Sequence, residues 1–255
     1  MINDTNQKVL VIADIHGNRE ALQAIVDSEG DFDIVLFLGD SVSPGPQPTE
    51  TLELLRSLSG IQIYGNHDLE MLDASLTQNW PPPWRAFNDW VRTQLSHEDL
   101  EFLRDLNEYG DYRVGNADVH LCHGYVPGRV RHLIPHSPDD DFNAIAQYTK
   151  ASTVFFGHSH VQFRRRVGNR EFINPGSVGQ NRCGKVLACY GVIEENQFEH
   201  RQVSYDPSPW ISALHRVQPL DEYPEFRAWF EDSLLSGFGI GKTDPWTRLA
   251  RDGYC

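Results

Sequence analysis

The 255-residue sequence contains no apolar run long enough to cross a membrane. Its longest runs, such as residues 9–13, fall far short of the ~20 apolar residues that span a bilayer. Residues 1–8 are polar and lack the apolar core of a signal peptide. We therefore expect a cytoplasmic protein with no membrane partner.

Cysteine is scarce and scattered. The chain has no C-x-x-C pair, and four cysteines are too few for a disulfide framework at this length. The spacing therefore predicts reduced thiols in a reducing compartment. The four are Cys122, Cys183, Cys189 and Cys255.

Basic residues are outnumbered, because 22 Lys and Arg stand against 36 Asp and Glu, for a formal net charge of −14. Such a surface repels nucleic acid and anionic membranes, so we do not expect nucleic acid as a partner. An anionic substrate would need positive charge supplied at its own site. The remaining composition, 40% hydrophobic and 23% charged, excludes disordered, collagen-like and coiled-coil proteins.

Short apolar runs rich in β-branched residues recur along the chain and predict strands. The first three alternate with helical stretches at residues 20–28 and 49–58, where apolar residues return every three or four positions. This alternation predicts an α/β fold with parallel crossovers, and the closer spacing after residue 119 predicts a mixed sheet or two layers. The predicted strands are residues 9–13, 34–38, 61–64, 119–122, 153–156, 171–173, 186–192 and 201–205.

We expect residues 1–205 to form one domain. Within it, residues 69–110 have a helical pattern and are interpreted as an insertion, interrupted at residues 80–84 by Trp-Pro-Pro-Pro-Trp, which we do not expect to be helical. Residues 206–255 predict a C-terminal extension packed on the same domain. In this extension residues 236–243 approximate a phosphate-binding loop, but Ser236 replaces its first glycine and no strand precedes it, which indicates a glycine-rich turn.

Polar residues follow five of the predicted strands directly. Ligands bind at the carboxyl ends of the strands in α/β sheets, so these side chains are expected to converge on one place. The D-x-H and H-x-H spacings help, because alternate residues of an extended segment point the same way. The candidates are Asp14, His16, Asp40, Asn66, His67, Asp68, His123, His158 and His160.

Seven of these side chains have the chemistry of metal ligands. Seven are too many for one tetrahedral ion but fit two divalent ions that share a carboxylate, ~3.5–4 Å apart. We expect manganese as the cofactor, with Fe, Zn, Ni or Co as alternatives, because the donors mix nitrogen and oxygen. With a bridging hydroxide the site would keep a charge of roughly +1, which suits one phosphate group. The seven are Asp14, His16, Asp40, Asn66, His123, His158 and His160.

Each residue alone also has a plain structural explanation. A buried His is often only hydrogen-bonded, and Gly-Asp or Gly-Asn is often a turn. Their joint occurrence after successive strands favours the metal site. The other histidines lack this context and are predicted to be surface or core residues: His97, His120, His132, His136, His200 and His215.

This series of motifs resembles the calcineurin-like metallophosphoesterase superfamily over roughly residues 8–205, and residues 173–180 resemble its small prokaryotic phosphodiesterase (YfcE-like) branch. The resemblance implies a four-layer α/β/β/α sandwich of two mixed sheets with a dinuclear metal site at the strand carboxyl ends. It also implies a role for each matching residue. These are Asp14, His16 and His160 for the first metal; Asn66, His123 and His158 for the second; Asp40 for both; and His67, paired with Asp68, beside the substrate phosphate.

The sequence departs from the protein serine/threonine phosphatase branch at two points. Residues 39–45 read Gly-Asp-Ser-Val-Ser-Pro-Gly and lack the phosphate-binding arginine of that branch, and Asp68 stands where that branch has Glu. Both departures weaken the interpretation as a protein phosphatase or a symmetrical dinucleoside tetraphosphate hydrolase.

We expect a metal-dependent phosphoesterase that hydrolyses the phosphodiester, or alternatively the phosphomonoester, of a small phosphorylated substrate. A hydroxide between the two ions would attack phosphorus in line, and His67 would donate to the phosphate or the leaving group. Asn18 and Arg182 are expected substrate contacts, Arg182 because a guanidinium matches phosphate oxygens. The alternatives are a metal-dependent nuclease and a non-catalytic scaffold, which would not need all seven ligands. The oligomeric state is left open.

Overall fold

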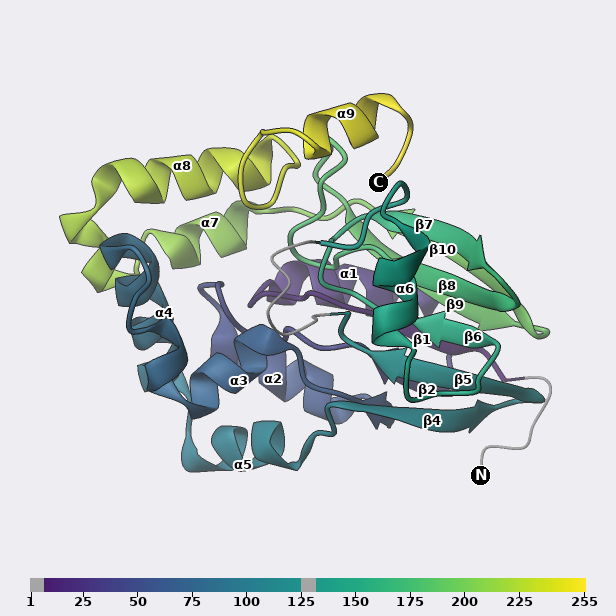
Figure 1. Cartoon of the computed structure of the whole chain (residues 1–255). Coiled ribbons are helices and arrows are strands. Elements are labelled where there is room, and N and C mark those ends of the chain that lie inside the picture. Colours follow the sequence, from purple (N-terminus) through teal and green to yellow (C-terminus); the bar gives the residue numbers. More distant parts are fainter. Residues whose placement is uncertain (1–6, 125–131) are drawn as a thin grey trace.

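The computed structural model describes residues 7–124 and 132–255, whose strands form two mixed five-stranded sheets (Figure 1). The predicted α/β class and the division into two mixed sheets are therefore confirmed. In order across the first sheet lie β10 (Gln197–Val203), β9 (Ala188–Glu194), β1 (Val9–Ile12), β2 (Ile34–Phe37) and β3 (Gly60–Gln62). Across the second lie β4 (Tyr109–Val114), β5 (Ala117–Cys122), β6 (Thr153–Phe155), β8 (Arg170–Pro175) and β7 (Gln162–Val167).

Strands β1, β2 and β3 run parallel, as the alternation of predicted strands and helices indicated. Strand β9 joins β1 antiparallel, and β10 joins β9 antiparallel. In the second sheet β5, β6 and β8 are parallel, whereas β4 and β7 are antiparallel strands at the two edges. Neither edge strand is among the predicted strands, because charged residues interrupt their apolar pattern.

The two sheets pack face to face through an apolar core. Val9 and Val11 of β1 belong to this core together with Phe155 of β6. Leu10 and Ile12 alternate with them and belong to the core on the other face of the first sheet. Burial on both faces explains why β1 is a continuous apolar run.

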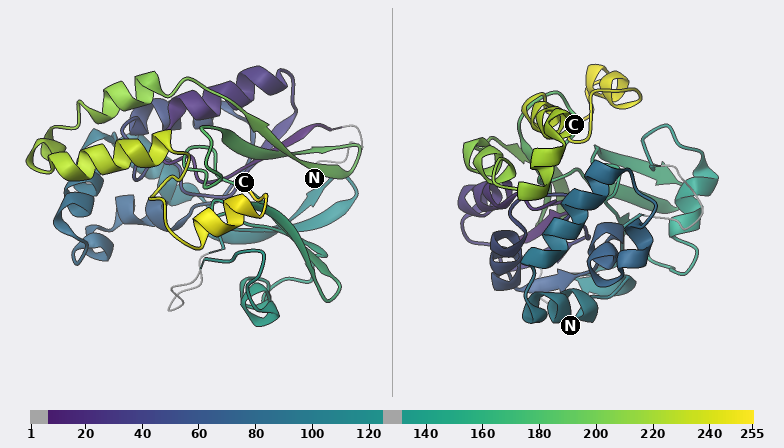
Figure 2. Two further views of the ribbon diagram at one scale, coloured as in Figure 1. Left: turned by 90° about the horizontal axis from the view of Figure 1, so that it is seen from above. Right: turned by 90° about the vertical axis from the view of Figure 1, so that its left-hand side faces the viewer.

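Helices cover the outer faces of both sheets, which gives the four layers (Figure 2). Helices α1 and α2 pack on the first sheet, and α6 lies on the second. Their bounds, with those of the remaining helices of the described chain, are α1 (Arg19–Glu29), α2 (Pro48–Ser57), α3 (Asn66–Leu72), η1 (Ala74–Thr77), α4 (Pro82–Gln94), α5 (His97–Asp105), α6 (Asp139–Ile145), α7 (Ser208–Leu214), η2 (Gln218–Glu222), α8 (Pro224–Leu235) and α9 (Trp246–Arg251).

The predicted break at residues 80–84 is only partly correct. Helix α4 begins at Pro82, inside the Trp-Pro-Pro-Pro-Trp stretch, and Pro83 and Trp84 are already helical. Proline is tolerated in the first turn because the amide it lacks would have no partner inside the helix. The stretch therefore starts a helix instead of interrupting one.

The C-terminal extension shares its apolar side chains with both halves of the fold. Trp210 of α7 and Phe230 of α8 belong to the core over the first sheet. Trp246 and Leu249 of α9 belong to the core over the second sheet. Residues 236–243 link α8 to α9, and Gly237 and Gly241 adopt positive φ there, so the predicted glycine-rich turn is correct.

The prediction of reduced thiols is wrong for one pair of cysteines, since Cys183 and Cys255 form a disulfide. Cys122 and Cys189 are free and buried, and the Sγ of Cys189 lies 3.5 Å from that of Cys255. The pairing joins residues 72 positions apart, so only the path of the extension brings them together. Among the described residues, no helix has both the length and the hydropathy needed to cross a membrane.

Candidate metal centre

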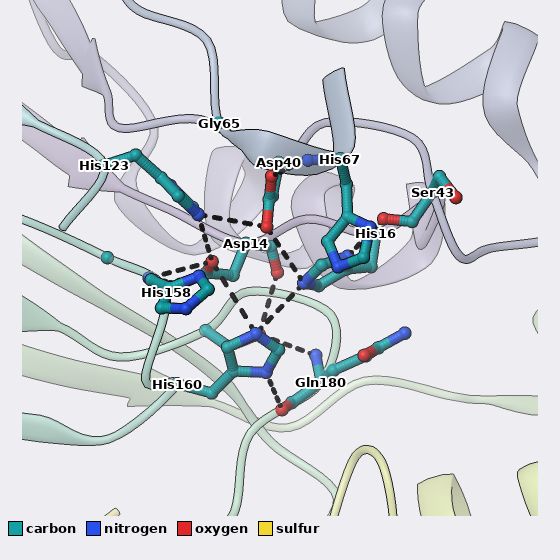
Figure 3. Close-up of polar contacts among 12 residues, drawn as sticks. Asp14, His16, Asp40, Ser43, Gly65, His67, His123, His158, His160 and Gln180 are labelled. Atoms are coloured by element: carbon teal, nitrogen blue, oxygen red, sulfur yellow. Dashed lines mark hydrogen bonds and ion pairs between the residues drawn. The ribbon is translucent and has the colours of Figure 1, made fainter. Parts of the chain in front are cut away.

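The predicted ligands meet where the carboxyl ends of strands from both sheets face each other (Figure 3). Asp14 follows β1, Asp40 follows β2, His123 follows β5 and His158 follows β6. Both carboxylates are almost completely buried, and His123 is only 5% exposed. The convergence expected from the strand ends is therefore present in the structure.

Six of the seven predicted ligands form two adjacent groups of three. Within each group the ligand atoms lie within 4.8 Å of one another. The two groups approach closely, because His123 Nε2 lies 3.9 Å from Asp14 Oδ1. Each group offers one carboxylate and two imidazoles, a donor set that suits first-row divalent metals. The groups are Asp14, His16 and His160, and Asp40, His123 and His158.

In the first group, the lone pairs of two imidazole nitrogens point toward each other. His16 Nδ1 lies 2.6 Å from the carbonyl oxygen of Ser43, and His160 Nδ1 lies 2.7 Å from that of Gln180. A carbonyl only accepts, so each Nδ1 carries the proton and each neutral ring keeps its lone pair on Nε2. These two Nε2 atoms lie 3.1 Å apart. A shared cation would convert this unfavourable contact into two ligand bonds.

In the second group a backbone carbonyl also orients one of the imidazoles. His123 Nδ1 donates to the carbonyl oxygen of Leu38 over 2.7 Å, which leaves Nε2 facing Asp40 Oδ2 at 3.1 Å. Burial lowers the pKa of His123, but Asp40 outweighs it and raises that pKa to about 9. Without a metal, the nearby carboxylate therefore favours the protonated form of this imidazole. A cation would take the place of that proton.

The electrostatics of the centre favour added positive charge. Burial lowers the pKa of His16 to about 3 and holds the pKa of His158 and of His160 well below the ordinary value. Neutral imidazole is the form that binds metal. Burial also raises the pKa of Asp14 to about 7, and the neighbouring Asp40 carboxylate adds to the rise, which His123 and Arg182 only partly offset. Divalent ions would supply that charge.

The backbone at the centre is held in an unusual conformation. Asp14, His16, Asp40, His158 and His160 all have φ between 49° and 67°. Residues with a side chain rarely adopt this left-handed region, and they keep it only where the surrounding structure enforces it. The strain falls on five of the six residues of the two groups, which indicates that the fold positions these side chains for function.

Asn66, the seventh predicted ligand, lies beside the second group. It is the first residue of α3, and it lines a cavity of about 290 Å³ together with His123. Its Oδ1 is buried and has no hydrogen-bond partner among the described residues. An oxygen in this state is available to a cation.

His67 is paired differently from the prediction. Its Nδ1 contacts Glu70 Oε2 at 2.7 Å, one helical turn along α3, and the predicted partner was Asp68. The carboxylate of Asp68 instead accepts hydrogen bonds from the backbone amides of Gly65, Asp40 and Ser41. Asp68 thus fastens the loop of Asp40 to α3. Glu70 reaches the imidazole of His67 because residues three apart lie on the same face of a helix, whereas adjacent residues do not.

Asn18 is also placed differently from the prediction. Its side chain caps α1 by accepting from the amide of Ala21, and it donates to Tyr205 and to the carbonyl of Gly179. It is completely buried and does not line the cavity at the centre. An Asn before a helix is a common N-cap, which explains its position without a substrate.

Arg182 enters the centre as expected. It lines a cavity of about 300 Å³ that also contains His16, Asp40 and His160. Its guanidinium stacks on Trp246 at 3.7 Å, and its Nε and Nη1 are buried with no hydrogen-bond partner among the described residues. These donors are therefore free to bind an anion in the cavity.

Several residues of this cavity were not predicted as site residues, and four of them bring an imidazole or a large apolar side chain. They are His132, which packs on His158 with ring centroids 4.8 Å apart, and Trp80, Trp84 and Ile240. None follows an apolar strand, and Trp80, Trp84 and Ile240 come from the helical insertion and the extension. The sequence contained one signal for them, the two tryptophans around three prolines, which indicates a rigid apolar surface at a helix start.

Two mixed sheets with Asp and His side chains clustered at their carboxyl ends define an α/β metallophosphoesterase fold. The chain belongs to the calcineurin-like phosphoesterase superfamily, whose domain it matches over residues 8–197. The resemblance stated from the motifs is therefore confirmed for the superfamily.

Relatives cover most of the chain. The uncharacterized protein MJ0912 of Methanocaldococcus jannaschii is 31% identical over 90% of this chain and 98% of its own. Serine/threonine-protein phosphatase 2 of Salmonella typhimurium is 34% identical over 69% of this chain and 90% of its own. The crystal structure of a metallophosphoesterase from Sphaerobacter thermophilus is 27% identical, with a TM-score of 0.67 over 91% of this chain and 99% of that chain. The chain is thus similar to hydrolases of phosphate esters.

Proposed function

We propose that the protein is a metal-dependent phosphoesterase that acts on small phosphodiesters. The observation that carries the proposal is the pair of adjacent buried groups. In the first, the Nε2 lone pairs of His16 and His160 face each other at 3.1 Å, and in the second, His123 Nε2 lies 3.1 Å from the Asp40 carboxylate. Two divalent ions would relieve the repulsion in the first group and replace the proton in the second. The resemblance of residues 173–180 to small prokaryotic phosphodiesterases supports diesters as the substrate class.

The donor set fits two ions, with manganese as the proposed metal. Asp14, His16 and His160 would hold one ion, and His123, His158 and Asn66 the other, with Asp40 shared. This assignment is based on the two groups and on the buried Asn66 oxygen that has no hydrogen-bond partner among the described residues. When bound, the ions would stabilise negative charge on the phosphate and activate the attacking water.

The side chains around the ions would bind and orient the ester. The free donors of Arg182 would bind phosphate oxygens on the side of the cavity lined by His160. His67 also lines the cavity, and its Nδ1 is held by Glu70, so that Nε2 is left to donate to the leaving oxygen.

Hydrolysis of two chromogenic esters tests this function. Protein stripped of metal and reloaded with Mn²⁺ is expected to hydrolyse bis-p-nitrophenyl phosphate faster than p-nitrophenyl phosphate, and a chelator is expected to stop both reactions. Asp118→Asn, at an exposed ion pair with Arg113, is a matched control that should leave both rates unchanged. A protein that hydrolyses neither ester with Mn²⁺, Zn²⁺, Fe²⁺, Ni²⁺ or Co²⁺ would be a scaffold, and the proposal would be wrong. Preference for the monoester would overturn the diester assignment alone.

Arg182→Gln is expected to lower kcat/KM by ~10- to 100-fold, mainly through a higher KM. A hydrogen bond to a charged group contributes ~1.5–3 kcal/mol, and each ~1.4 kcal/mol is a factor of ten in rate. Metal content should not change, because Arg182 belongs to neither ligand group. Steady-state kinetics and elemental analysis measure the two effects. Arg164→Gln, at an edge-strand ion pair, serves as the control; identical kinetics for wild type and Arg182→Gln would show that Arg182 has no contact with substrate.

A further inference from the structure

One part of the lining of the cavity, here called the wall, is aromatic and apolar. Trp80, Pro81 and Trp84 come from the helical insertion, and Ile240 comes from the turn between α8 and α9. Pro44 also lines this cavity, together with the histidines of the centre and Arg182. The phosphate-binding side alone does not require such a wall.

One tryptophan of the wall is packed firmly against the C-terminal extension. The ring of Trp84 packs edge to face against Phe226, Trp229 and Phe230 of α8, with centroids 4.9, 5.7 and 5.8 Å away. These contacts fix the start of α4 against the extension. An apolar surface that is ordered before binding loses little conformational entropy when a ligand covers it.

Trp80 lies next to His67, the residue proposed to donate to the leaving oxygen. Its ring lies 5.9 Å from that of His67, and the two planes are nearly perpendicular at 77°. His67 in turn lies edge-on to His16, with centroids 5.4 Å apart. A group bonded to the phosphate on the side of His67 would therefore extend along Trp80.

The size of the cavity limits what that group can be. At about 300 Å³, it lies at the lower end of the roughly 300–1,000 Å³ of small-molecule sites. This volume takes a phosphate and one ring system, and it leaves no room for a nucleic-acid duplex. Rings bind best to tryptophan when they are planar, because stacked and edge-to-face contacts both need a π face.

We propose that the natural substrates are small phosphate esters that carry a planar aromatic or heteroaromatic ring, and that Trp80 stacks on this ring. The proposal rests on the phosphoesterase function proposed above. Phosphate oxygens would contact Arg182 and the metal side, while the ring would cover Trp80. Trp80 would thus select the ester by its alcohol portion and leave the chemistry to the residues around the ions.

Two phosphonates that cannot be hydrolysed isolate the ring contact from catalysis. Benzylphosphonate and cyclohexylmethylphosphonate have the same charge and nearly the same size, but only the first is planar. Binding to the Mn²⁺-loaded protein is measured by calorimetry, and the wild type is expected to favour benzylphosphonate by ~2- to 10-fold, the usual range for an aromatic pair. Trp80→Phe should keep this preference, and Trp80→Leu should remove it.

Trp90→Leu is the matched control. Trp90 lies on the same helix as Trp84 but does not line the cavity, so this variant should keep the wild-type preference. Hydrolysis of bis-p-nitrophenyl phosphate is measured on every variant. Hydrolysis with equal affinity for the two phosphonates would overturn the ring assignment while leaving the phosphoesterase intact. Absence of both hydrolysis and phosphonate binding would overturn the proposed function and this inference together.

Discussion

Asp40→Asn is expected to abolish hydrolysis and to weaken the binding of both ions by more than ~100-fold. The carboxylate belongs to the second group and also faces the first: its Oδ2 is 3.1 Å from His123 Nε2 and 4.0 Å from His16 Nε2. Burial alone would raise the pKa of Asp40, but His123, His67 and His16 outweigh it and keep the carboxylate ionised. Loss of a residue that merely supports a ligand costs ~10–100-fold in affinity, so loss of a shared ligand charge should cost more.

Asparagine makes this test selective for charge. Asp40 has φ of 63°, a conformation that Asn adopts about as readily as Asp, and Asn Oδ1 can still accept the amide hydrogen of His67. The fold should therefore survive, which circular dichroism and thermal unfolding would verify. Metal content by elemental analysis and kcat/KM on bis-p-nitrophenyl phosphate give the two readouts. Two bound ions with near-wild-type activity would make Asp40 a turn residue and exclude its shared role.

His67→Ala is expected to reduce turnover by ~10²–10⁴-fold on diesters of alkyl alcohols, the usual contribution of a general acid. The loss on p-nitrophenyl esters should be much smaller, because p-nitrophenolate leaves without a proton. Both ions should remain, since His67 belongs to neither ligand group. Comparison of the two substrates on protein of known metal content measures the effect.

Glu70→Gln separates orientation from proton transfer. It keeps the shape of the side chain that lies 2.7 Å from His67 Nδ1 but removes its charge. We expect ~10- to 100-fold loss on alkyl diesters, in the range found for partners that orient a functional imidazole. Equal damage to alkyl and p-nitrophenyl esters in His67→Ala, or loss of an ion, would show that His67 binds phosphate or metal and is not the acid.

Most of the metal centre could be predicted because it depends on local sequence. Apolar runs that end in Asp or His are visible in the chain, and parallel strands place their carboxyl ends at one edge whatever the rest of the fold does. Asp14, Asp40, His123 and His158 were found in this way, and the structure places them together. Their metal-binding roles stay predictions.

Other predictions were wrong where two residues close in sequence could fill the same role, or where one residue could fill two roles. Asp68 and Glu70 are both acidic and both close to His67 in sequence, and only the turn of α3 decided which one reaches Nδ1. Asn18 follows a strand end as the ligands do, but the start of α1 used its side chain as a cap. The helix start at Pro82 was missed for a similar reason, since proline ends helices and also begins them.

The sequence by itself determined the α/β class, the parallel start of the first sheet and the identity of the clustered Asp and His residues. Each of these depends on the period of the apolar residues and on the side chains directly after each apolar run. Only the tertiary structure decided the aromatic wall, the stacking of Trp246 on Arg182 and the disulfide between Cys183 and Cys255. These features join the insertion, the extension and the loop after β8, which lie far apart along the chain. Contacts of this kind have no period in the sequence, since they depend on how separate elements pack.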